Sequence, residues 1–114
     1  MELTVLAVPD CPNVPVLEGR LAGILAGRPG VNLTRRVIAD AGEAARLGMH
    51  GSPTLLVDGR DPFPAPGPGL ALACRLYPAA DGRLEGAPSM AALRQALGQA
   101  GQPNANIANY KLFE

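Results

Sequence analysis

A single cysteine lies where an apolar run gives way to a helical pattern, and this junction constrains the fold more than any other feature. The run from Leu3 to Ala7 is typical of a buried strand, and Pro9-Asp10 ends it. Apolar residues then recur at helical spacing and predict a helix over 14–26 with one buried face: Val14, Leu17, Leu21 and Leu25. Cys11 stands between the two elements. Its thiol is therefore expected near a helix N-terminus, where backbone N–H groups and the helix dipole favour a thiolate.

A second motif, Gly51-Ser52-Pro53, leads into another apolar run, Thr54 to Val57, which predicts a buried strand. Asp58-Gly59 is a typical turn at the end of such a strand. Proline immediately before a buried strand usually occupies a fixed, tight backbone position. Pro53 is therefore a candidate cis-proline.

The remaining periodicities complete the element order β-α-β-α-β-β-α. The run from Val31 to Ile38 partly alternates and predicts the second strand. Asp40 is the expected N-cap of a short helix that Gly48 ends. The stretch from Ala71 to Tyr77 predicts a fourth strand, and Pro88-Ser89 begins the last helix.

This order predicts an α/β fold, a three-layer α/β/α sandwich around a mixed four-stranded sheet. Helical crossovers between the first three strands imply parallel pairing, and the last two strands are expected to form an antiparallel hairpin. Residues 1–101 are expected to form the domain, with 102–114 as a flexible C-terminal tail. Prolines and glycines over 60–69 predict a long irregular loop.

Composition excludes several classes of function. The 114 residues suit one domain, and the zero net charge gives no electrostatic footprint for nucleic acid or an anionic membrane. No apolar run approaches the roughly 20 residues that span a bilayer. The chain begins with a strand pattern and not a signal peptide, so we expect a cytoplasmic protein whose two cysteines are reduced thiols. No motif indicates a cofactor.

The two motifs together resemble the thioredoxin and glutaredoxin superfamily, in which an N-terminal cysteine faces a cis-proline across a small groove. Residues 8–97 also resemble small bacterial thioredoxin-like proteins, some of them labelled alkylmercury-lyase-like. The segments that carry this likeness are Pro9-Asp10-Cys11-Pro12-Asn13, Gly51 to Gly59, Asp61-Pro62-Phe63 and Cys74-Arg75-Leu76-Tyr77. The resemblance implies a cis Ser52–Pro53 bond. It also implies that the Ser52 backbone is free to pair with an extended peptide or a cysteinyl ligand.

The resemblance implies thiol–disulfide exchange, with Cys11 as the attacking thiolate. The residues expected to shape the substrate groove are Pro12, Ser52, Pro53 and Thr54. Val14 stands at the position of the second cysteine in the Cys-x-x-Cys pattern, so a small thiol or a protein thiol from outside must release any mixed disulfide.

Three neighbours of this site are candidates for accessory roles. Asp10, directly before Cys11, opposes the thiolate that the helix favours. Cys74 is expected to point into the core, with a resolving thiol or second metal ligand as the alternative. His50 is expected to be an exposed loop residue, with an imidazolium partner for the thiolate as the alternative.

Three other residues and two other classes of function stay open. Arg75 and Tyr77 fit a solvated strand face or an anion site, and Phe63 is a candidate anchor for the long loop. The alternatives to thiol exchange are a thiolate protein for a soft metal such as mercury or Cu(I), and a non-catalytic binding module.

Overall fold

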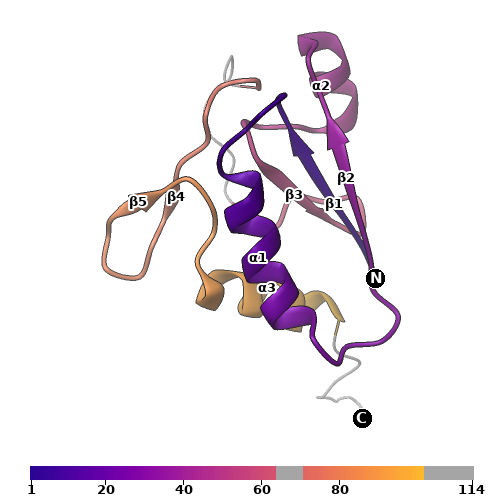
Figure 1. Cartoon of the computed structure of the whole chain (residues 1–114), viewed down its shortest axis with the longest axis vertical. Coiled ribbons are helices and arrows are strands. Elements are labelled where there is room, and N and C mark those ends of the chain that lie inside the picture. The colour runs from indigo at the N-terminus through magenta and orange to yellow at the C-terminus, as the bar shows by residue number, and fades with distance from the viewer. Residues whose placement is uncertain (64–70, 102–114) are drawn as a thin grey trace.

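The computed structural model describes residues 1–63 and 71–101 as a mixed α/β fold with three helices and a three-stranded mixed sheet (Figure 1). In chain order the elements are β1 (Glu2–Ala7), α1 (Val14–Leu25), β2 (Asn32–Val37), α2 (Ala41–Leu47), β3 (Thr54–Val57), β4 (Tyr77–Pro78), β5 (Leu84–Glu85) and α3 (Met90–Gly101). The predicted tail 102–114 and most of the predicted loop lie outside the described residues. In the described part of the chain, no helix has both the length and the apolar character needed to cross a membrane.

The sheet has the order β2-β1-β3, with β1 at its centre. The β1–β2 pair is parallel as predicted, but β3 runs antiparallel to β1, so the prediction of three parallel strands is wrong. The seven residues of α2 rise only about 10 Å, whereas a six-residue strand such as β2 spans about 20 Å. Because α2 cannot carry the chain back along the sheet, β3 starts at the end where β2 finishes.

The predicted fourth strand does not form among the described residues. The stretch from Ala71 to Leu76 contributes one isolated parallel bridge, between Ser52 and Cys74. Tyr77–Pro78 instead pairs antiparallel with Leu84–Glu85 in a hairpin that stands apart from the sheet (Figure 1). The backbone hydrogen bonds between this stretch and the middle of the molecule go to Gly51 and Ser52, in the loop before β3. The predicted four-stranded sheet and its terminal hairpin are therefore corrected to a three-stranded sheet and a separate two-stranded one.

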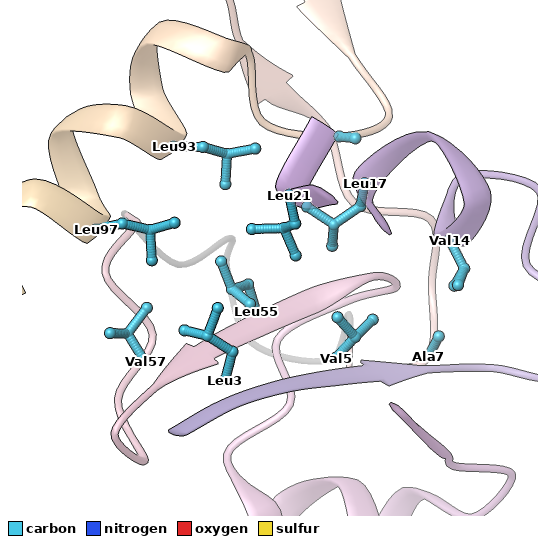
Figure 2. Close-up of a cluster of buried hydrophobic side chains, with 11 residues drawn as sticks. Leu3, Val5, Ala7, Val14, Leu17, Leu21, Leu55, Val57, Leu93 and Leu97 are labelled. Atoms are coloured by element: carbon cyan, nitrogen blue, oxygen red, sulfur yellow. The ribbon is translucent and has the colours of Figure 1, made fainter. Parts of the chain in front are cut away.

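Helices cover both faces of the sheet. On one face, α1 and α3 pack over β1 and β3, with Leu17, Leu21 and Leu93 fully buried (Figure 2). On the other face, Leu6 of β1 packs with Ala44 of α2 and its neighbours. Each buried leucine side chain contributes about 1.5–3 kcal/mol. These two clusters hold β1 in the middle of the molecule.

The predicted N-cap of the short helix is confirmed. The Asp40 carboxylate accepts hydrogen bonds from the backbone N–H groups of Gly42 and Glu43, at 2.6 and 3.4 Å. Gly48 ends α2 in the left-handed conformation, with φ 78°. Both ends of α2 are therefore determined by local sequence.

Removing this cap should destabilise the protein measurably. We expect Asp40→Ala to lower the free energy of unfolding by about 0.5–2 kcal/mol, because two backbone N–H groups lose their acceptor. Asp40→Asn is the matched control, since asparagine is an equally good N-cap and should stay within about 0.5 kcal/mol of wild type. Urea unfolding followed by circular dichroism measures both. Equal losses in the two variants would contradict the capping role.

Candidate functional site

Cys11 lies in the turn that joins β1 to α1. Its thiol is partly buried, and its carbonyl oxygen accepts a hydrogen bond from the Val14 N–H at 3.3 Å. Asp10 adopts a positive φ of 57°, which makes this turn tight. Val14 is the first residue of α1, so the thiol stands ahead of the helix and not within its first turn.

The Cys11 side chain lines an open groove of about 450 Å³. The lining residues come from the ends of β1 and β2 and from the start of α1: Ala7, Val8, Asp10, Cys11, Pro12, Val14, Pro15, Arg35 and Val37. Small-molecule sites commonly measure about 300–1,000 Å³. The groove is thus large enough for a small ligand, and it lies on the β2 side of β1.

Two charged residues, Asp10 and Arg35, stand in the groove lining. Arg35 donates from Nε and Nη2 to the Glu18 carboxylate of α1, at 2.8 and 2.5 Å. These hydrogen bonds hold the pKa of Glu18 below its usual value. Within residues 1–63 and 71–101, the remaining nitrogen of Arg35, Nη1, has no hydrogen bond. The groove therefore presents one cation and one anion to a ligand.

The motif that precedes β3 lies on the other side of β1. The Ser52–Pro53 peptide bond, expected to be cis, is cis. The Ser52 hydroxyl accepts a hydrogen bond from the Val8 N–H at 3.0 Å, which ties this loop to the turn that bears Cys11. The Ser52 N–H donates to the Ala73 carbonyl at 2.8 Å, and the Ser52 carbonyl accepts from the Arg75 N–H at 3.0 Å. The expectation of a free Ser52 backbone is therefore wrong.

The side chains of Ser52, Pro53 and Thr54 are all buried. Thr54 Oγ1 donates to the Gly51 carbonyl at 2.6 Å and accepts from the His50 N–H at 3.1 Å. These bonds fix the loop from inside the fold. The His50 side chain is exposed, as predicted, and Pro12 is exposed at the groove.

Sequence reasoning missed a buried polar cluster beside Pro53. The Arg75 side chain is only 1% exposed and pairs with Asp61, its Nη1 lying 2.6 Å from Oδ2. Nη1 also lies 3.3 Å from Thr54 Oγ1. The interpretation of Arg75 and Tyr77 as a solvated strand face is wrong, because both side chains are buried. The interpretation as an anion site is wrong, because the Asp61 carboxylate already pairs with the Arg75 guanidinium. The sequence signal for this cluster was Asp61 upstream of Arg75 and Tyr77, which are two positions apart and therefore lie on the same side of an extended chain.

Tyr77 completes this cluster. Its ring lies under the Arg75 guanidinium, with 4.7 Å from Cζ to the ring centroid, and its hydroxyl donates to the Pro53 carbonyl. Phe63 packs edge-on against it at 5.6 Å between centroids, so the contact expected of a loop anchor is present. Burial raises the pKa of the Tyr77 hydroxyl, and this is the largest effect. The charge of Arg75 lowers the pKa in part, whereas the electrostatic effects of Asp61 and Cys11 raise it. The hydroxyl therefore remains a donor at neutral pH.

Cys74 is exposed, so the prediction that it points into the core is wrong. It forms no disulfide with Cys11, since both are free thiols. Arg75 and Tyr77 both point inward, and the alternation of an extended chain turns Cys74 and Leu76 outward. Among the described residues, no three His, Cys, Asp or Glu side chains gather in a way that could hold a metal ion.

Comparisons with protein-family models, with curated proteins and with solved structures found no match to this chain. Function is therefore inferred from the chemistry of the groove. Cys11 supplies the thiol in its lining. A thiolate there can attack a disulfide or an electrophile, or bind a soft metal.

Proposed function

We propose that this protein exchanges thiols and disulfides through Cys11. The observation that carries the proposal is the position of the thiol, partly exposed in an open groove of small-molecule size at a strand–helix junction. A thioredoxin-like fold is part of the same proposal. Its support is the cysteine between β1 and α1, the cis Ser52–Pro53 bond, and the pairing of β1 with a parallel and an antiparallel neighbour.

The exchange has two steps. The Cys11 thiolate attacks one sulfur of a disulfide R–S–S–R′, so that a Cys11–S–S–R bond forms while the S–S bond breaks and R′–S⁻ leaves and takes up a proton. A second thiolate, R″–S⁻, then attacks the sulfur of R. It forms R–S–S–R″ and returns Cys11 to the thiolate. Val14 stands where a neighbouring thiol would be, so this second thiol comes from outside the chain.

Disulfide exchange at Cys11 is expected to be faster than at Cys74, although Cys74 is the more exposed thiol. We expect Cys11 to form the mixed disulfide with 4,4′-dithiodipyridine at least about tenfold faster, because it lies just ahead of the N-terminus of α1, whose partial positive charge favours negative charge on the attacking sulfur. Stopped-flow release of thiopyridone, with mass spectrometry of each cysteine, measures the two rates.

Cys11→Ser and Cys74→Ser are the matched variants for this test. Turnover with excess external thiol should disappear in Cys11→Ser and persist in Cys74→Ser. Faster reaction at Cys74 would mean that exposure alone decides the rates, and the proposed function would then be wrong. Among the described residues no observation favours the soft-metal alternative or the non-catalytic module.

A further inference from the structure

The stretch 71–77, called the strap below, occupies the hydrogen-bonding edge of the loop before β3. The Gly51 N–H donates to the Ala71 carbonyl at 3.0 Å. Both backbone groups of Ser52 are likewise paired with the strap, through Ala73 and Arg75. An extended polypeptide binds a sheet edge by filling such N–H and C=O groups. At Ser52 the chain itself already fills them.

Side chains fix the strap from inside. The Arg75–Asp61 ion pair is almost fully buried, and the Tyr77 hydroxyl bonds to the Pro53 carbonyl. Lifting the strap would expose or separate this pair, and breaking a buried ion pair is strongly destabilising. The strap is therefore a stable part of the fold and not a segment that an incoming peptide displaces.

The approach to Cys11 from the opposite side of β1 is open. The groove there is walled by Pro15 of α1 and by Arg35 and Val37 of β2, and neither Ser52 nor Pro53 lines it. Every residue of β2 is exposed, and Val37 retains 56% of its surface. A molecule small enough for about 450 Å³ can reach the thiol by this route.

We propose that the strap closes the Ser52 edge to extended polypeptides and that Cys11 takes small-molecule disulfides through the groove between α1 and β2. This inference rests on the proposed thiol exchange and names its class of substrate. The size of the groove then determines which disulfides reach Cys11, and Val37 forms part of the groove wall.

Two substitutions on β2 test the route. Val37 and Leu33 are both exposed aliphatic residues on the same face of β2, but only Val37 lines the groove. Val37→Trp is expected to slow the reaction of Cys11 with 4,4′-dithiodipyridine by at least about tenfold, because the indole fills the entrance. Leu33→Trp should stay within about twofold of wild type. Val37→Arg, a long polar side chain at the same position, is the second variant if Val37→Trp does not fold.

A peptide probe tests the strap. A linear peptide whose central cysteine is activated as a pyridyl disulfide carries the same leaving group as the small probe. At wild-type Cys11 it should react at least about a hundredfold more slowly than 4,4′-dithiodipyridine. Equal rates for the two probes, or an unchanged small-probe rate in Val37→Trp, would overturn the inference and leave thiol exchange standing. Failure of both probes at Cys11 would overturn the proposed function itself.

Discussion

Arg75→Met is expected to lower the free energy of unfolding by about 3–5 kcal/mol, a large share of the 5–15 kcal/mol typical of a small domain. The substitution keeps much of the side-chain volume but leaves the Asp61 carboxylate, itself only 10% exposed, without its cation. It also removes the hydrogen bond to Thr54 and the contact with the Tyr77 ring. Urea unfolding of the purified protein measures the loss.

A surface ion pair supplies the control. Arg83 Nε lies 3.6 Å from Asp81 Oδ2, but the two side chains are 80% and 61% exposed. Arg83→Met should therefore change stability by less than about 1 kcal/mol. In the double variant Arg75→Met/Asp61→Leu no buried charge is left alone, so part of the lost stability should return. A double variant less stable than Arg75→Met would contradict the assignment of the loss to the stranded carboxylate.

Gly51→Ala is expected to lower the free energy of unfolding by about 2–5 kcal/mol. Gly51 has φ 98°, a conformation that strains any residue with a Cβ, and the new Cβ would lie 2.8 Å from the Cβ of Arg75. Overpacking of this kind adds about 1–3 kcal/mol to the backbone strain. The clash falls between the loop before β3 and the strap, so the substitution pushes these two segments apart.

Gly48→Ala separates the two effects. Gly48 also has a positive φ, 78°, but a Cβ there would meet no atom within 4 Å. Its alanine variant should lose only about 1–2 kcal/mol, from strain alone. Chemical unfolding of both variants gives the difference. If Gly51→Ala loses no more than Gly48→Ala, the strap is not packed against Gly51 as described.

Local sequence determined the elements that rest on local signals. The Asp40 cap and the left-handed Gly48 set the ends of α2, because capping depends only on residues within one turn. The spacing of Leu17 and Leu21 predicted the buried face of α1, because helical periodicity records which side meets the core. The same reasoning located Cys11 between a strand and a helix. These features needed no knowledge of the rest of the chain.

Tertiary structure decided how the elements meet. The direction of β3 followed from the length of α2 relative to β2, a comparison of two elements that no single segment contains. Arg75 became a buried cation because Asp61, from a different segment, came within hydrogen-bond distance of it. Sequence alternation alone could not tell which side of the stretch 71–77 faced inward, and so Cys74 was misplaced. Groove and strap both depend on contacts between residues distant in sequence, and for that reason only the folded chain reveals them.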